Sequence, residues 1–205
     1  MPKRLVIAVD CDDVLLPTSQ AIINDYNRRF GTSLTLEDMY QPATLDRWGT
    51  DEDDVAIERV NEFLRSEEHA RLAPDPAAVE SIHWLAERHE LHLITGRADF
   101  LKEATAQLLD TFFKGCFTSI EHTNYIVAST STAVRRSKGD VCANINATVL
   151  IDDHLVHAED ALRTLDRVIV FGDYPWNRRD VLLDGMVRCI DWLSVTKEID
   201  TYASR

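Results

Sequence analysis

The sequence has little cysteine and no paired-cysteine motif. No two of its four cysteines stand at the C-x-x-C spacing; they are Cys11, Cys116, Cys142 and Cys189. Closely spaced cysteines are typical of structural zinc sites and of small disulfide-stapled domains, so neither is expected here. We expect reduced thiols, which favours a cytoplasmic protein.

Long hydrophobic runs are missing as well. No apolar stretch approaches the ~18 residues of a membrane-spanning helix, so no membrane association is expected. The basic N-terminus is followed by the apolar run Leu5–Val9, which is too short for the core of a signal peptide and is better interpreted as a strand. With only 7 Gly and 6 Pro in 205 residues, and with 45% hydrophobic residues, the composition also excludes collagen-like and disordered chains.

Positive charge is in the minority. The chain has 22 Lys and Arg against 35 Asp and Glu, which gives a formal net charge of -13. Such a surface repels polyanions, so duplex nucleic acid and anionic membranes are not expected as partners. A small anion is still compatible with this charge, because one metal ion and a few local cations outweigh a distant background field. The oligomeric state is not indicated.

What the chain does contain is an alternation of apolar, β-branched runs with helical periodicity. The runs expected to be strands are Arg4–Asp10, Leu91–Thr95, Phe117–Ile120, Thr148–Asp152 and Arg167–Phe171. Helices are expected from the N-cap signal Asp75-Pro76, after Asp99 as a second cap, and from Leu155 to Leu165. This alternation predicts an α/β protein with a Rossmann-like three-layer αβα core around a parallel sheet.

The connection between the first and second expected strands is longer than a single crossover helix requires. It contains two helical patterns, Thr18–Phe30 and Asp51–Ser66. We therefore expect residues 17–74 to form a small helical cap inserted after the first strand, and residues 1–16 and 75–205 to form the core domain. Ligands of open α/β sheets bind outside the carboxyl ends of the strands, so the cap should cover the active site.

Polar residues follow several of the expected strands. The first strand ends in Asp10-Cys11-Asp12-Asp13, the second in Thr95-Gly96-Arg97 and the fourth in Asp152-Asp153-His154, while Lys138 precedes the helix that leads into the fourth strand. Neighbouring parallel strands would bring these groups into one small volume. Carboxylates at such close range repel each other unless a cation lies between them, and oxygen ligands at strand ends suit Mg²⁺.

This set of groups is suited to phosphoryl transfer. A carboxylate beside Mg²⁺ can attack phosphorus and form an aspartyl-phosphate, and a second carboxylate can protonate the leaving alcohol and then activate water. Thr95, the backbone at Gly96 and Lys138 can bind phosphoryl oxygens.

The same residues resemble the motifs of the haloacid dehalogenase (HAD) superfamily. The run from Val6 to Val14 with its D-x-D pair is similar to motif I, Leu91–Thr95 to motif II, Lys138 to the motif III lysine, and the acidic pair after Val149 to motif IV. The resemblance implies a HAD hydrolase with a small helical C1-type cap. Its motifs occur in the right order and span most of the chain.

Particular roles follow from the resemblance. Asp10 would be the nucleophile and a metal ligand, and Asp12 the general acid and base with its backbone carbonyl on Mg²⁺. Asp152 would be a carboxylate ligand, and Asp153 a ligand through water or a neighbour of the ligands. The acid at position 12 favours phosphatases over dehalogenases and transport ATPases.

The Thr-Gly-Arg motif, the paired acids and the segment Tyr174–Asn177 resemble the 5′(3′)-deoxyribonucleotidase group. The resemblance implies a Mg²⁺-dependent phosphatase for a small phosphorylated substrate, most simply a (deoxy)nucleoside monophosphate. Residues proposed by type to contact the substrate are Arg97, Tyr40, Trp48 and Phe63. A sugar-phosphate or phosphoglycolate phosphatase and a non-catalytic relative that binds a phosphorylated ligand are the alternatives. His154 and His157 are interpreted as surface or supporting histidines because no third nitrogen or sulfur ligand is near them in the sequence.

Overall fold

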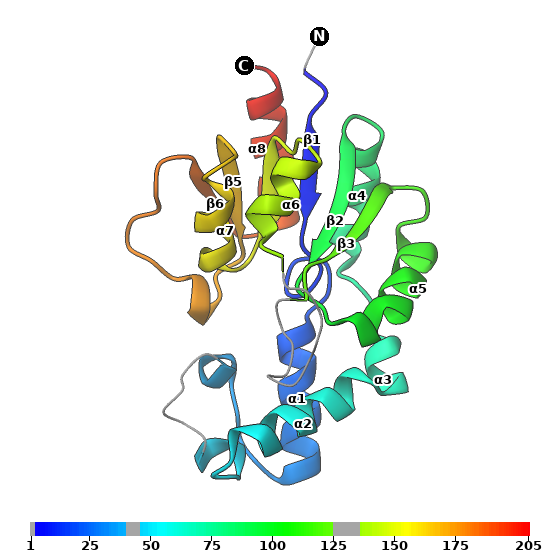
Figure 1. The fold of residues 1–205 in the computed structure, drawn as a ribbon, viewed down its shortest axis with the longest axis vertical. Coiled ribbons are helices and arrows are strands. Elements are labelled where there is room, and N and C mark those ends of the chain that lie inside the picture. The colour runs from blue at the N-terminus through cyan, green and yellow to red at the C-terminus, as the bar shows by residue number, and fades with distance from the viewer. Residues whose placement is uncertain (1–2, 40–45, 125–135) are drawn as a thin grey trace.

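The structure is a computed structural model that describes residues 3–39, 46–124 and 136–205. Six parallel strands form one sheet, which lies in the upper part of the molecule as drawn in Figure 1. In chain order the strands are β1 (Val6–Val9), β2 (Glu90–Thr95), β3 (Phe117–His122), β4 (Val149–Asp152), β5 (Arg167–Phe171) and β6 (Met186–Cys189). Their order across the sheet is β3-β2-β1-β4-β5-β6. The strand order therefore reverses between β1 and β4, and this is the point at which open α/β sheets bind ligands.

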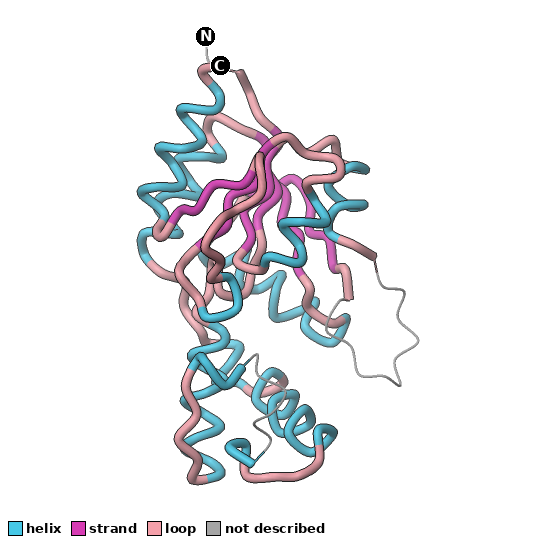
Figure 2. The backbone as a smooth tube through the Cα atoms, turned by 90° about the vertical axis from the view of Figure 1, so that its left-hand side faces the viewer, coloured by secondary structure: helices cyan, strands magenta, loops and turns pink. Residues whose placement is uncertain are grey.

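Helices cover both faces of the sheet, as Figure 2 shows. On one face lie α4 (Pro76–Ala86), α5 (Lys102–Phe112) and α8 (Trp192–Ala203); on the other lie α6 (Lys138–Asn144) and α7 (Leu155–Ala161). Each face has its own cluster of buried apolar residues. The strand runs are apolar on both sides because both sides are covered. The expected Rossmann-like three-layer α/β core is confirmed.

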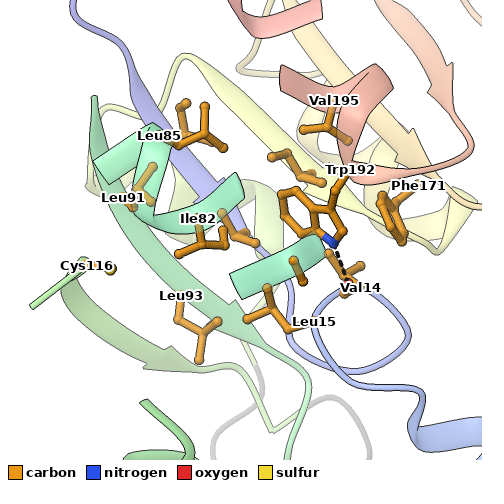
Figure 3. Packing of buried hydrophobic residues seen from close by; sticks show 14 of the residues in the cluster. Val14, Leu15, Ile82, Leu85, Leu91, Leu93, Cys116, Phe171, Trp192 and Val195 are labelled. Carbon is orange, nitrogen blue, oxygen red and sulfur yellow. Dashed lines mark hydrogen bonds between the residues drawn. The ribbon is translucent and has the colours of Figure 1, made fainter. Parts of the chain in front are cut away.

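The core under α4 and α8 reaches the loop that follows β1. Trp192, 2% exposed, packs against Phe171 with 5.4 Å between ring centroids, and its indole nitrogen donates to the carbonyl oxygen of Val14 at 3.2 Å. Figure 3 shows this indole among the buried residues of the cluster. The contact fixes the position of the loop that carries the first acidic motif.

The segment between β1 and β2 forms helices of its own below the sheet (Figures 1 and 2). They are α1 (Thr18–Phe30), the 3₁₀ turn η1 (Leu36–Met39), α2 (Asp53–Leu64) and the short α3 (Glu67–Ala70). A small apolar cluster around Tyr26, which is 1% exposed, holds α1, η1 and α2 together. Gly31 ends α1 at φ 67, the left-handed conformation that glycine adopts without strain.

Local signals account for most of the element boundaries. The Asp75 side chain accepts a hydrogen bond from the backbone N–H of Ala77, so it caps α4 as expected, with Pro76 in the first turn. Asp99, expected to cap the next helix, instead lies within the 3₁₀ turn η3 (Asp99–Leu101) and forms an ion pair with Lys102. That expectation was wrong, because the chain makes one tight turn before α5 begins.

The last strand has no counterpart among the expected elements. β6 is short, contains Arg188, and pairs with β5 only after a long loop that includes the 3₁₀ turn η4 (Pro175–Asn177). Within residues 3–39, 46–124 and 136–205, no helix has the length and apolar character needed to cross a membrane. All four cysteines are buried and free.

Candidate active site

The carboxyl ends of β1 and β4 place two carboxylates side by side around one lysine. The backbone N–H of Asp10 donates to the carbonyl oxygen of Ile151 at 3.0 Å, which continues the strand pairing to the end of β1. Lys138, at the start of α6, lies with its Nζ 2.8 Å from Asp10 Oδ1 and 2.6 Å from Asp152 Oδ2. All three side chains are at least nine-tenths buried, so these ion pairs are shielded from water.

Burial and charge act against each other at this triad. Burial raises the pKa of Asp10 to about 7, although Lys138 pulls it down, and the negative charge of Asp152 raises it further. Burial would also raise the pKa of Asp152, but Lys138 and then His157 hold it below its ordinary value. The pKa of Lys138 stays above its usual range because the two carboxylates outweigh its own desolvation. The lysine is therefore a fixed cation.

A third carboxylate makes the charge balance unfavourable. Asp10, Asp152 and Asp153 can each offer one oxygen such that the three atoms lie within 4.8 Å of one another. Burial, and after it the charges of Asp152 and Asp10, raises the pKa of Asp153 well above its ordinary value. One lysine cannot offset three acids, and an all-oxygen donor set suits a hard divalent cation. The residues present therefore fit a metal ion.

Asp12 has a different partner. Arg97 donates to it from Nε to Oδ2 at 2.8 Å and from Nη2 to Oδ1 at 2.6 Å, and the Thr18 hydroxyl donates to Oδ1 at 2.5 Å. Burial would raise the pKa of Asp12, but the charge and hydrogen bonds of Arg97, followed by the Thr18 bond, hold it below its ordinary value. Asp12 is thus a carboxylate in this arrangement, whereas Asp10 retains a proton more readily.

Arg97 is itself held in place by hydrogen bonds to two threonines, Thr105 and Thr95. Its side chain is 2% exposed, and Nη1 donates to the Thr105 hydroxyl at 3.2 Å. Its backbone N–H donates to Thr95 Oγ1, also at 3.2 Å. Thr95 is fully buried at the end of β2, while Gly96 and Arg97 line the cavity beside it. The second motif therefore presents an arginine and a glycine backbone to the site, with the threonine beneath them.

These groups lie at one end of a cavity of about 530 Å³. We call its charged side the floor, formed by Asp10, Asp12, Arg97, Lys138 and Asp153. We call its hydrophobic side the apolar wall, formed by Ile22, Met39, Leu64, Ala98, Phe100 and Leu101. The wall draws Ile22 from α1, Met39 from η1 and Leu64 from α2. A ligand in this cavity would touch both the sheet and the helical insertion.

Six further polar or acidic side chains complete the described lining: Asp13, Thr18, Ser19, Asn61, His154 and His157. Burial lowers the pKa of both histidines, to about 4 for His157, so both are neutral near pH 7. Their ring centroids are 5.2 Å apart. In the described part of the chain the group suited to a metal ion consists of aspartates and includes neither histidine.

Two of the three aromatic residues proposed from the sequence as substrate contacts, Trp48 and Phe63, lie outside the described lining of the cavity. Trp48 packs edge-on against Tyr26 at 4.8 Å, and Phe63, 3% exposed, packs against His69 at 5.7 Å. Neither is part of the described lining of the cavity. Both fill the interior of the insertion, where large aromatic residues bury the most apolar area. Tyr40 lies outside the described residues.

The sequence reasoning missed Phe100, which is 44% exposed and lines the cavity from η3. Its position three residues after Arg97 was the available signal, because residues that follow a strand end share its edge of the sheet. It also missed Asn61 and Leu64, which are three apart and so share one face of α2.

The chain was compared with models of known protein families. Residues 4–203 match the model described as 5′ nucleotidase, deoxy (Pyrimidine), cytosolic type C protein. A search of curated proteins finds none that matches.

Several solved structures share the fold. A haloacid dehalogenase-like hydrolase from Streptococcus pneumoniae is 12% identical, with a TM-score of 0.67 over 95% of this chain and 98% of that one. The HAD-hydrolase YfnB from Bacillus subtilis, solved bound to magnesium, is 13% identical, with a TM-score of 0.65 over 97% and 99%. A predicted phosphatase from Clostridium acetobutylicum is 15% identical, with a TM-score of 0.65 over 96% and 98%. At these identities the likeness concerns the fold.

Proposed function

Because the chain belongs to the 5′ nucleotidase, deoxy (Pyrimidine), cytosolic type C protein family and is therefore a HAD-type phosphoric monoester hydrolase, we propose that it is a Mg²⁺-dependent phosphatase. Its proposed substrate is a (deoxy)nucleoside 5′- or 3′-monophosphate, and the reaction passes through an aspartyl-phosphate on Asp10. The observation that carries this proposal is the contrast between the two acids of the first motif. Lys138 and two further carboxylates surround Asp10, whereas Asp12 is paired with Arg97 alone among the charged floor residues.

Asp10 is the proposed nucleophile. Its carboxylate lies at the end of β1, where Lys138 stabilises the ionised form that attacks phosphorus. The ester bond to the leaving oxygen breaks as the bond from Asp10 to phosphorus forms. Lys138 and the backbone at Gly96 are placed to bind phosphoryl oxygens, and Thr95 supports this turn from beneath.

Asp10 and Asp152 are proposed metal ligands, together with the backbone carbonyl of Asp12, as the HAD resemblance implies. The resemblance gives Asp153 a role through water or beside the ligands, and we propose it as a third carboxylate ligand because its oxygen can lie within 4.8 Å of those of Asp10 and Asp152. When bound, Mg²⁺ supplies positive charge that lets the carboxylates and an anionic phosphoryl group approach one another. The excess of buried carboxylates over lysine is what supports this assignment.

Asp12 is the proposed general acid and base. Arg97 keeps it ionised at rest, which is the form that accepts a proton from the water that hydrolyses the aspartyl-phosphate. For the first step the proton can enter with the substrate, because the second pKa of a phosphomonoester is ~6 and the monoanion is populated near neutrality. Asp12 takes up that proton from the phosphoryl group and passes it to the leaving oxygen as the ester bond breaks.

The apolar wall supports a nucleoside as the leaving group. A sugar phosphate offers hydroxyls to every side, whereas a nucleoside has a planar base that can lie against Phe100, Ile22 and Leu64. The volume is in the range of small-molecule sites. Residues 17–74 are the proposed cap, and its closure over the floor would exclude water from the first step.

Phosphate release from a panel of substrates tests the proposal. The panel contains nucleoside and deoxynucleoside 5′- and 3′-monophosphates, deoxyribose 5-phosphate and phosphoglycolate, each with Mg²⁺ and with EDTA. We expect metal-dependent release concentrated on the nucleotides. Release concentrated on the sugar phosphate or on phosphoglycolate would overturn the leaving group while retaining the chemistry. No release from any substrate would favour a relative that only binds phosphorylated ligands.

A further inference from the structure

The segment Tyr174–Asn177, which follows β5, contacts the acidic loops of two other strands. The indole nitrogen of Trp176 donates to Asp153 Oδ2 at 2.6 Å. The side-chain amide of Asn177 donates to the backbone carbonyl of Asp153 at 2.8 Å. Both the carboxylate and the backbone of Asp153 are therefore held by the same short turn.

Tyr174 joins this turn to the first acidic loop. Its hydroxyl donates to the backbone carbonyl of Asp13 at 2.9 Å, and its ring stacks on that of Trp176 with 4.7 Å between centroids and 3° between planes. Gly172 makes room for this stack, because a Cβ on it would lie 2.4 Å from the tyrosine ring. The plane of the Trp176 indole is thus set by Tyr174, whose hydroxyl and backbone N–H are both hydrogen-bonded.

The turn is anchored to the edge of the sheet. Asn177 is fully buried and donates also to the carbonyl of Phe171 at 2.9 Å. Arg188, on β6, donates from Nη1 to Asn177 Oδ1 at 2.7 Å and from Nη2 to the Asn177 carbonyl at 2.6 Å. A late, short strand thereby supports the geometry of a carboxylate at the switch point.

Asp153 needs such a support more than its neighbours do. Lys138 pairs with Asp10 and Asp152, while within the described ranges neither a lysine nor an arginine forms an ion pair with Asp153. A neutral N–H donor can orient a carboxylate without competing with a metal cation for its charge. An ammonium group in the same place would repel that cation.

We propose that Trp176 is a positioning residue for the metal site, which orients the Asp153 carboxylate by occupying Oδ2 and so leaves Oδ1 for the cation shared with Asp10 and Asp152. Tyr174 and Asn177 hold Trp176 and the Asp153 backbone in fixed positions relative to each other. The inference rests on the proposed Mg²⁺ site. It assigns to the loop after β5 a task in metal affinity rather than in contact with the substrate.

The test measures Mg²⁺ binding directly, by isothermal titration calorimetry on the enzyme without substrate. Trp176→Phe removes the N–H donor and keeps a ring that can stack on Tyr174. We expect its dissociation constant for Mg²⁺ to rise about 10-fold, within the range seen when the partners of metal-binding carboxylates are removed. Trp84→Phe is the matched control. This indole lies on α4 under the Arg88 guanidinium, and its loss should leave Mg²⁺ affinity unchanged.

Activity adds a readout that a merely structural role would not give. For Trp176→Phe, the Mg²⁺ concentration for half-maximal activity should rise by the same factor, while kcat at saturating Mg²⁺ stays within about 2-fold of wild type. Trp176→His, which restores a ring N–H, should recover part of the lost affinity. An unchanged Mg²⁺ dissociation constant in Trp176→Phe would overturn the inference.

Failure of the inference can be told apart from failure of the proposed function. If wild type binds no Mg²⁺, or if Asp152→Ala binds it as well as wild type does, the proposed metal site is wrong. If wild type binds Mg²⁺ in an Asp152-dependent way and Trp176→Phe binds equally well, only the role of Trp176 is lost. Should Trp176→Phe not fold, ¹⁵N-labelled wild type serves instead. The Trp176 indole N–H resonance is identified as the one absent from the spectrum of Trp176→His. In wild type this resonance should shift on addition of Mg²⁺, and an unmoved resonance would contradict the inference.

Discussion

The floor and the apolar wall of the cavity differ in how tightly their side chains are held. On the floor, Lys138 lies 2.8 Å from Asp10, and Arg97 makes two hydrogen bonds to Asp12. On the wall, Phe100 is 44% exposed, and Met39 and Leu64 come from an insertion with a small core of its own. The floor has the fixed charges that a reaction needs, and the wall has the apolar area that a leaving group needs. Changes to the floor should therefore reduce kcat, and changes to the wall should raise KM.

The largest effect should come from Asp10→Asn. Without the nucleophile, turnover should fall at least about 1000-fold, as for the loss of other catalytic nucleophiles. Binding of a nucleotide to the wall should persist, measured by calorimetry with a non-hydrolysed analogue. The matched control is Asp75→Asn at the cap of α4, where Asn caps as well as Asp does and activity should not change. Near-wild-type turnover by Asp10→Asn would show that Asp10 is not the nucleophile.

Arg97→Lys should have the next largest effect. Lysine keeps the charge but loses the planar fork that fixes both oxygens of Asp12, and misplacing a catalytic group by ~1 Å can cost about 100-fold in rate. Because Arg97 lowers the pKa of Asp12, weakening this pair raises that pKa, and the acid limb of the pH–rate profile should move to higher pH.

The pH–rate profile is the deciding readout for this variant. A lower kcat with an unmoved acid limb would assign Arg97 to the phosphoryl group instead of to Asp12. Arg88→Lys, a change of the same kind at an exposed arginine stacked on Trp84, should behave as wild type.

Phe100→Ala tests the wall. Loss of one aromatic face against a base should raise KM for a nucleotide about 10-fold, the lower end of the range for base stacking, with little change in kcat. Deoxyribose 5-phosphate lacks the base, so its KM should not respond. The same change at Leu193, exposed on α8, is the control. Equal losses for both substrates would mean that Phe100 does not meet the base.

The smallest effect concerns the response of the floor to pH without metal. The folded protein holds a proton on Asp10 up to about pH 7, whereas the unfolded chain releases it near 3.8. The native state therefore binds more protons in this window, and the free energy of unfolding should decrease as pH rises from 3.8 to about 7.

Thermal unfolding of wild type and Asp10→Asn in EDTA measures this contribution. The wild-type Tm should fall relative to that of the variant across the window and level off above it. Added Mg²⁺ should raise the wild-type Tm by a few degrees at pH 8 and by less at pH 6, because metal and proton compete for the same carboxylates. A Mg²⁺ stabilisation that is larger at pH 6 would contradict the proposed ligands.

Much of the floor could be predicted from the sequence because it follows from local pattern and sheet topology. The apolar runs before Asp10, Thr95 and Asp152 predict parallel strands, and parallel strands bring their carboxyl ends to one edge. The edge strand β6 could not be predicted, since its four residues include Arg188 and acquire strand structure only by pairing with β5. Asp99 was misinterpreted for a related reason: an acid before a helical pattern can lie in a turn as well as at a cap.

The sequence by itself determined the alternation of the first five strands with helices, the acids at the strand ends and the family whose motifs these acids resemble. Tertiary structure alone decided the partners. Arg97 pairs with Asp12 across 85 positions, and Trp176 reaches Asp153 from the end of another strand. It also decided which apolar residues line the cavity, Phe100 rather than Trp48 or Phe63. Periodicity and capping act over a few residues, whereas a side chain's exposure to a cavity depends on how an insertion packs over a sheet, which no local pattern encodes.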